Sequence, residues 1–389
     1  MTSMSPTTPS TTIGEPVSEN GGGERAQLHR VFRTGRTRGL GWRLDQLAAI
    51  ETLCDEQEPA IAAALAADLG RPPVEAWLGD IASTKGEAVY ARKHLKKWMR
   101  RQRQPLPLAQ RPGRGWVQYD PLGSVLVIGP WNYPFYLSMG PLVAAVAAGN
   151  CALLKPSELA PATSALLADL VPKYLDSQAV RVVEGDGATT QRLIAQGYDH
   201  VLFTGGTEIG RKIMAAAAPT LTPVTLELGG KSPVIVTSDA DLDVTARRIA
   251  WVKLMNSGQT CIAPDYVLAE RSVVDTLTAK IVENMAVFRA QETSTGQRIV
   301  NRRQFDRLRG LVESTSGTIV TGGGCVEAEL RIEPTVIRDP APDDAVMADE
   351  IFGPILPVLG IENTAAAIEF INARPKPLAL YVFTGSNRL

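Results

Sequence analysis

From Ser124 onward, the chain alternates between short apolar runs of strand length and segments long enough to form helices. The first series of apolar runs is SVLVIG (124–129), CALLK (151–155), VRVVEG (180–185), HVLFTGG (200–206) and PVTLEL (223–228). Strands that are each followed by a helix form a parallel sheet with helices on both faces. Ligands of such sheets bind beyond the carboxyl ends of the strands. The alternation therefore predicts an α/β domain over residues 124–228 with a ligand site at one edge of its sheet.

A second series of apolar runs follows Cys261. It consists of YVLAE (266–270), TIVTGG (318–323), PTVIRD (334–339), ILPVLGI (355–361) and ALYVFTG (379–385). We expect these runs to form a second α/β domain, residues 229–389, with the functional site between the two domains.

The segments before Ser124 have different patterns. Residues 1–24 are rich in Ser, Thr, Pro and Gly, so we expect a disordered tail. Apolar residues in the segment 25–111 recur at helical spacing, and the run IAAALAADLG ends on Gly70, a plausible helix C-cap. Within the segment 112–123, GWVQYDPLG (115–123) alternates like a strand and ends in a turn, which predicts a small projecting hairpin.

Charge and composition exclude several classes of function. The 389 residues carry a formal net charge of −1, which provides no overall field to attract nucleic acid or an anionic membrane. The four cysteines are scattered without close pairs, and none of the three histidines lies within metal-ligand spacing of another. We therefore expect a cytoplasmic protein with no disulfide framework, no metal site, no nucleic-acid partner and no membrane span, acting on a small molecule.

Cys261 is the one cysteine whose neighbours favour reactivity. It follows Ser257-Gly258-Gln259-Thr260, small and polar residues that can present a side chain and its own N–H on one side of a turn. A thiol presented in this way can attack a carbonyl group and stabilise the resulting oxyanion. Glu227, in TLELGGK, is expected to be buried, with a raised pKa suited to a general base. A buried, inert cysteine is the alternative.

Four other motifs have both a functional and a plain interpretation. FTGGTEIGRK (203–212) is a glycine turn before a helix that can bind a pyrophosphate, or simply a turn. Lys155 and Glu158 follow a strand and can be a surface ion pair. Asn132, in GPWNYPF, can hold its own turn together. On physical grounds alone, Phe352 in DEIFGPILPV is a core residue and Glu350 lies on a solvated edge.

LELGGKSP (226–233) and GQTC (258–261), in this order and at this separation, resemble the aldehyde dehydrogenase superfamily. The resemblance covers roughly residues 25–389. APDYV directly after Cys261, together with RPKPLALYVF (374–383), is most similar to the class 3 and fatty aldehyde branch. The resemblance implies a Rossmann-like NAD(P)-binding domain, a catalytic domain, and a hairpin that serves oligomerisation in a homodimer.

The resemblance also assigns roles to individual residues. Cys261 would be the nucleophile, Asn132 an oxyanion donor beside the Cys261 N–H, and Glu227 the base that activates water against a thioester. The substrate would be a medium- or long-chain aliphatic or an aromatic aldehyde, oxidised to the carboxylic acid. The residues that would bind the cofactor are Lys155, Glu158, Gly205, Gly206, Thr207, Gly210, Glu350 and Phe352.

Within this set, Lys155 and Glu158 would hold the adenosine ribose, and Gly205, Thr207 and Gly210 form the GxTxxG turn. Glu350 would bind the nicotinamide ribose, with Phe352 near the ring. A carboxylate at Glu158 repels a 2′-phosphate, which favours NAD over NADP, although class 3 members use both.

The sequence stops at Leu389, whereas members of the superfamily continue for several tens of residues. We therefore expect impaired activity and weaker dimers from the chain as written. Two other functions stay open at this point. One is a thiol esterase that uses Cys261 without a nicotinamide, and the other is a catalytically silent remnant that binds nucleotide or a partner subunit.

Overall fold

The computed structural model describes residues 23–291 and 297–386. The expected disordered tail, residues 1–24, lies outside these residues except for its last two positions. Glu24 already belongs to a helix, α1 (Glu24–Arg33), so the predicted boundary of the tail is one residue too late.

A helical layer precedes the first sheet. It contains α2 (Leu40–Glu56), α3 (Glu58–Leu69), α4 (Pro73–Ala76), a π-helical turn η2 (Trp77–Ile81) and α5 (Ala82–Trp98). Gly70 ends α3 in the left-handed conformation, with a φ of 68°, and so confirms the predicted C-cap. The π-helical turn was not predicted.

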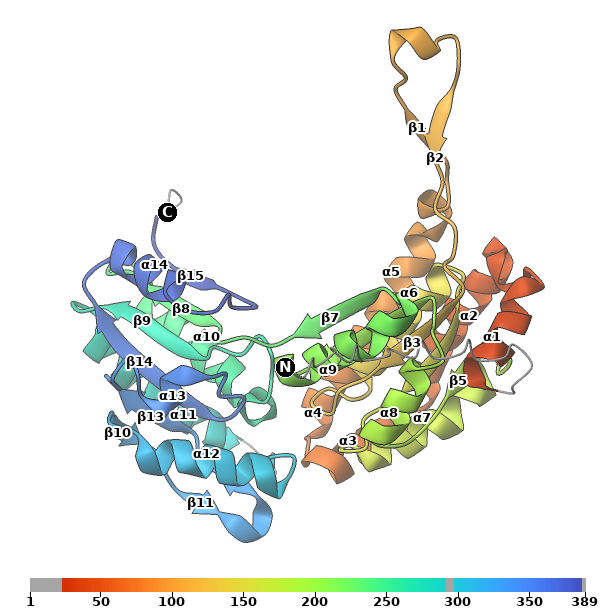
Figure 1. Ribbon diagram of the computed structural model, residues 1–389. Coiled ribbons are helices and arrows are strands. Elements are labelled where there is room, and N and C mark those ends of the chain that lie inside the picture. Colours follow the sequence, from red (N-terminus) through yellow and green to blue (C-terminus); the bar gives the residue numbers. More distant parts are fainter. Residues whose placement is uncertain (1–22, 292–296, 387–389) are drawn as a thin grey trace, which may run out of the picture.

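A two-stranded hairpin projects from the body of the molecule (Figure 1). Its strands β1 (Gln102–Gln104) and β2 (Gly115–Val117) pair in antiparallel fashion. The expected helical segment, residues 25–111, includes β1, and for these residues the expectation is wrong. Pro105 follows Gln104 directly, and a residue before proline avoids the helical conformation.

The first sheet has the order β5-β4-β3-β6-β7, and all of its strands are parallel. Its strands are β3 (Ser124–Ile128), β4 (Cys151–Lys155), β5 (Val180–Val182), β6 (His200–Gly205) and β7 (Val224–Leu228). The helices between them are α6 (Tyr136–Ala147), α7 (Pro161–Tyr174), α8 (Gly187–Ile194) and α9 (Thr207–Ala217). Chain order reverses between β3 and β6, which creates the switch point at which doubly wound sheets bind ligands.

The second sheet has the order β10-β13-β14-β9-β8-β15, in which only β10 is antiparallel to its neighbour. Its strands are β8 (Pro233–Val236), β9 (Tyr266–Glu270), β10 (Thr318–Thr321), β13 (Thr335–Arg338), β14 (Ile355–Ile361) and β15 (Tyr381–Phe383). The helices are α10 (Leu242–Leu254), α11 (Val274–Gln291), α12 (Arg302–Ser314), α13 (Ala345–Ala348) and α14 (Thr364–Asn372). The strands β11 (Cys325–Val326) and β12 (Arg331–Ile332) form a separate antiparallel pair.

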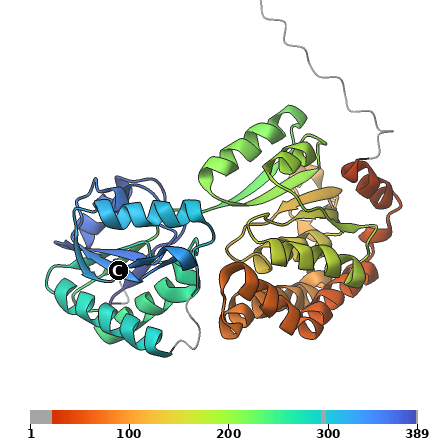
Figure 2. The same cartoon turned by 90° about the horizontal axis from the view of Figure 1, so that it is seen from below.

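The two sheets form two lobes, which lie side by side in Figure 2. Each lobe has one hydrophobic cluster on each face of its sheet. On β3, for example, Val125 and Val127 pack with α2, α5, α6 and α7, whereas Leu126 and Ile128 pack with α1, α8 and α9. No cluster of the described residues mixes the two lobes. The predicted fold class, two α/β units with a hairpin, is confirmed.

Candidate active site

Cys261 follows a turn of three successive left-handed residues at the end of α10. Asn256, Ser257 and Gly258 have φ angles of 49°, 51° and 71°. A Cβ on Gly258 would lie 2.2 Å from the carbonyl oxygen of Gly353, so only glycine fits there. The Asn256 Nδ2 donates to the Gln259 carbonyl at 3.0 Å, and the Gln259 Nε2 donates back to the Asn256 carbonyl at 3.0 Å. These bonds hold an uncommon backbone of the kind that concentrates at functional sites.

The Cys261 thiol is only partly buried, unlike those of Cys54 and Cys151. Burial raises the pKa of the Cys261 thiol, and the charges of Glu350 and Glu227 raise it further. The backbone N–H groups of Cys261 and Ile262 hydrogen-bond the sulfur and partly counteract this rise. The sequence does not decide whether the site stabilises the Cys261 thiolate or whether a base removes the proton of the thiol during the reaction. The net rise in pKa favours assistance by a base.

Glu227 lies near the carboxyl end of β7, where it pairs in register with Thr204 of β6. Its expected burial is wrong, because the side chain is exposed. The reason is the strand order, in which β7 forms an edge of the sheet and has a neighbour on one side only. Glu227 nevertheless lies close enough to Cys261 for its charge to raise the pKa of the thiol, so the two side chains belong to one site.

Asn132 connects the two lobes at the carboxyl end of β3. The side chain is 4% exposed, and its Nδ2 donates to the Gln259 carbonyl at 3.1 Å, two residues before Cys261. Its own carbonyl accepts from the Asn256 Nδ2 at 2.9 Å. An amide nitrogen has two protons, so one N–H of Asn132 remains for a substrate oxygen.

The glycine turn after β6 opens onto solvent at the start of α9. A Cβ on Gly205 would lie 2.4 Å from the Phe203 ring, and one on Gly210 would lie 2.8 Å from Leu228. A Cβ on Gly206 would meet no atom of the described chain within 4 Å. No described side chain caps α9, so its first N–H groups can bind a phosphate.

Lys155 ends β4, two strands from this turn. The lysine side chain is 3% exposed, and its Nζ pairs with the half-exposed Glu158 Oε2 at 2.6 Å. Together with the turn after β6, this pair lies at the carboxyl edge of the first sheet on either side of its switch point. The residues therefore fit an extended dinucleotide.

Glu350 and Phe352 lie on the loop before β14. On physical grounds alone, Glu350 was expected on a solvated edge and Phe352 in the core, and both expectations are wrong. Glu350 is half-buried: its carboxylate accepts from the Gly230 N–H, and its Oε2 lies 2.2 Å from the position of a Cβ on Gly229. Burial, together with the charge of Asp265, raises the pKa of Glu350 to about 7. Phe352 is partly exposed, has a φ of 49°, and contacts Trp131 of the first lobe with ring centroids 5.3 Å apart.

Three charged residues that hold this loop were missed by the sequence analysis. Lys231 pairs with Asp265 at 2.6 Å and donates to the Val346 carbonyl at 2.7 Å, while the Arg307 Nη2 donates to the Ile351 carbonyl at 2.6 Å. Lys231 and Asp265 lie within the motifs LELGGKSP and APDYV, so their positions could have suggested a role. Nothing in their spacing indicates that they pair.

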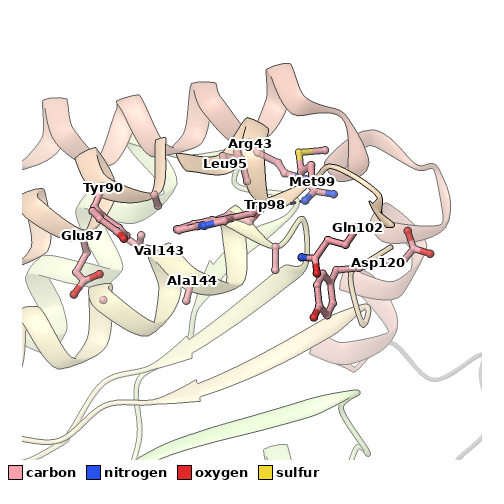
Figure 3. A pocket seen from close by; sticks show the side chains of 15 residues that line it. Arg43, Glu87, Tyr90, Leu95, Trp98, Met99, Gln102, Asp120, Val143 and Ala144 are labelled. Carbon is pink, nitrogen blue, oxygen red and sulfur yellow. Dashed lines mark hydrogen bonds between the residues drawn. The ribbon is translucent and has the colours of Figure 1, made fainter. Parts of the chain in front are cut away.

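A pocket of about 410 Å³ lies away from these residues, between α5 and α6 at the base of the hairpin (Figure 3). Its walls are apolar and aromatic, with Tyr90, Leu95, Trp98 and Val143 among them, and Arg43 at its rim. It contains none of the predicted site residues.

The model of the aldehyde dehydrogenase family matches residues 27–389. Aldehyde dehydrogenase family 3 member A2 of Mus musculus is 45% identical over 366 residues, which are 93% of this chain and 75% of that protein. The chain belongs to the aldehyde dehydrogenase family. The "aldehyde dehydrogenase, dimeric NADP-preferring" of Rattus norvegicus is 41% identical over 93% of this chain and 80% of its own length.

Solved structures of the family have the same fold. The substrate-bound state of Staphylococcus aureus AldH has a TM-score of 0.89 and 40% identity, over 93% of this chain and 80% of that chain. The P. syringae indole-3-acetaldehyde dehydrogenase AldA in complex with NAD+ and IAA has a TM-score of 0.86 and 26% identity, over 93% and 76% of the two chains. This aldehyde dehydrogenase is an oxidoreductase that uses NAD(P)+, as the resemblance implied, and the silent remnant is not favoured.

Proposed function

We propose that this aldehyde dehydrogenase oxidises neutral, apolar aldehydes, with Cys261 as nucleophile, Asn132 as oxyanion donor and Glu227 as base. The single observation that carries the assignment is the hydrogen bond from the Asn132 Nδ2 to the Gln259 carbonyl, which brings an amide donor from one lobe to the cysteine turn of the other.

In the first step, the Cys261 sulfur bonds to the carbonyl carbon and gives up its proton to Glu227, which passes it to solvent before the second step. The carbonyl oxygen becomes negative and accepts from the Cys261 N–H and the remaining N–H of Asn132. NAD(P)+, when bound, supplies the acceptor for the hydride that leaves this carbon. Glu227 then takes a proton from water, which attacks the resulting thioester, breaks the carbon–sulfur bond and releases the acid.

The residues that would hold the nucleotide come from both lobes. Lys155, Glu158, Gly205, Gly206, Thr207 and Gly210 would bind the adenosine and phosphate groups, and Glu350 and Phe352 the nicotinamide riboside. The open N-terminus of α9 and the half-exposed carboxylate of Glu158 support this proposal. Glu158 favours NAD+ over NADP+ on charge, with NADP+ as a second cofactor.

The charges around Cys261 support a neutral substrate. The two side-chain charges that act on its thiol are both carboxylates, Glu350 and Glu227. Aromatic hydroxyls contact its neighbours, since Tyr133 bonds the Thr260 Oγ1 at 2.9 Å and Tyr381 donates to the Ile262 carbonyl at 2.5 Å. An aldehyde that carries its own carboxylate would be repelled, whereas an aliphatic or aromatic chain would pack against the rings.

We also propose an assembly, a location and domain limits for the chain. The hairpin exposes Trp116 and Val117 and would join two copies of the chain in a homodimer, as the name of the rat relative states for that protein. The domains would run from 25 to 111, 112 to 123, 124 to 228 and 229 to 389. None of the helices in the described part has both the length and the apolar composition needed to cross a bilayer. We propose a cytoplasmic location.

The test is NADH production from decanal and NAD+ by the purified chain. Cys261→Ala should abolish turnover, whereas Cys325→Ala, the other half-buried cysteine, should not change it. Glu227→Gln should lower kcat by about 10²- to 10⁴-fold, because the thiol and the hydrolytic water both lose their base. Turnover by the Cys261 variant at the parent rate would eliminate the assignment.

A further inference from the structure

Arg71 and Asp80 form an ion pair in the first lobe, and both side chains are fully buried. Arg71 follows the C-cap of α3, and Asp80 lies in the π-helical turn η2. Neither residue belongs to a motif of the sequence analysis. Single π-helical turns within helices are rare and are often found at functional sites.

The pair contacts both sides of the turn that carries Asn132. The Arg71 Nη2 donates to the Asn132 carbonyl at 2.5 Å. The Asp80 Oδ1 accepts from the N–H groups of Phe135 and Tyr136, at 3.2 and 2.9 Å. The turn that holds the oxyanion donor is therefore fixed at its start by a cation and at its end by an anion.

The Arg71 guanidinium also packs on the ring of Tyr133, with its Cζ 4.4 Å from the ring centroid. A Cβ on Gly79 would lie 2.8 Å from the Tyr133 Cε1, so the ring contacts a bare backbone as well as the guanidinium. The Tyr133 hydroxyl reaches the Thr260 Oγ1, next to Cys261. The pair thus acts on the cysteine turn through Tyr133 as well as on Asn132.

A stabilising role alone is a weak explanation for this arrangement. Well-packed apolar residues often replace a buried ion pair without loss of stability, because both charges must first be desolvated. The partners of this pair are instead backbone groups of the turn that carries Asn132. Oxyanion stabilisation requires a donor already placed within hydrogen-bond distance of the developing charge, and small misplacements are costly.

We propose that Arg71 and Asp80 are positioning residues that hold the Asn132 turn, and through Tyr133 the Cys261 turn, in the geometry of the oxyanion site. This inference rests on the proposed role of Asn132. Arginine is required because its planar fork can bond Asp80 and the Asn132 carbonyl together while its face packs on a ring. A lysine can keep the charge pair but not all three contacts.

The experiment compares Arg71→Lys, Asp80→Asn and Asn132→Ala with a control, Arg92→Lys, in an exposed pair in which Arg92 binds both oxygens of Glu51. We expect Arg71→Lys and Asp80→Asn to lower kcat by about 10- to 100-fold. The KM for NAD+ should stay within about twofold of the parent value, because the residues proposed to bind the nucleotide are not displaced. The control should leave kcat unchanged.

Two further measurements separate positioning from folding. Combining Arg71→Lys with Asn132→Ala should lower kcat by less than the product of the two separate losses, because part of the effect of Arg71 acts through Asn132. Amide hydrogen exchange in the peptide 131–137 should accelerate in Asp80→Asn, even if Arg71→Lys does not fold.

The outcomes distinguish this inference from the proposed function. Full activity in Asn132→Ala would overturn the role of Asn132 and the inference with it. An impaired Asn132→Ala beside an unaffected Arg71→Lys and Asp80→Asn would overturn the inference only. A loss of kcat on Arg71→Lys that persists undiminished in the Asn132→Ala background would also overturn it.

Discussion

Glu350→Gln tests the electrostatics of the loop before β14, which packs against the turn of residues 256–258 at Gly353. The pKa of Glu350 is raised from 4.5 to about 7, chiefly by burial. Because the folded state holds the proton more tightly, ionisation of Glu350 destabilises the fold. The cost is absent below pH 4.5, grows between pH 4.5 and 7, and is complete above pH 7.

The magnitude follows from the two pKa values. A tenfold change in proton affinity corresponds to 1.36 kcal/mol, so the rise gives about 3 kcal/mol, reduced to about 2–3 kcal/mol because the carboxyl is partly exposed. Glutamine resembles the protonated acid and keeps an acceptor for the Gly230 N–H. We therefore expect Glu350→Gln to stabilise the second lobe relative to the parent at pH 8.5 but not at pH 4.5.

Thermal unfolding followed by calorimetry measures this difference. For a lobe of roughly 150 residues, about 2–3 kcal/mol corresponds to a rise in Tm of about 5–10 °C at pH 8.5. Glu369→Gln, an exposed glutamate on α14 of the same lobe, is the control and should show no pH-dependent difference. A Tm difference between Glu350→Gln and the parent that is the same at both pH values would refute the reasoning.

Three further predictions concern the site. Because the pKa of the Cys261 thiol is raised, its alkylation by iodoacetamide should accelerate with a midpoint above that of a free cysteine peptide, near pH 8.5; a midpoint below that of the peptide would contradict it. Gly258→Ala places a methyl group against the Gly353 carbonyl, so turnover should fall at least tenfold and the protein should lose about 1–3 kcal/mol, measured by activity and thermal unfolding; normal turnover would show that the turn tolerates a side chain. Gly206→Ala has room for its methyl group, so Tm should stay constant while the Kd for NAD+ from fluorescence titration rises about tenfold; an unchanged Kd would place the phosphates elsewhere.

The sheets could be predicted from the sequence because several of their strands, such as β3, β4 and β14, are buried at nearly every position. Each of the ten apolar runs contains a strand of the structure, since a strand covered on two sides is apolar at consecutive positions. The short strands β1, β11 and β12 are polar or of two to three residues, and give no such pattern. The strand β8, PVIV, was passed over because it follows the LELGGKSP motif without a break.

The identities of the site residues were predictable, but their environments were not. Exposure of Glu227 depends on β7 lying at a sheet edge, which is a property of strand order rather than of the segment TLELGG. Glu350 can be half-buried because Gly229, from another part of the chain, has no side chain to occupy the space of the Glu350 carboxylate. Arg71 and Asp80 act on a turn some 50 to 60 residues later, and no periodicity connects positions so far apart.

Within the described residues, the chain passes only once from the first sheet to the second, between β7 and β8. During synthesis on the ribosome, the first lobe can therefore complete its core before most of the second has emerged, as N-terminal units of multidomain proteins generally do. The part of the nucleotide site that the first lobe provides would be formed ahead of the thiol. The Cys261 sulfur would then pack against an already folded first lobe as the second lobe folds.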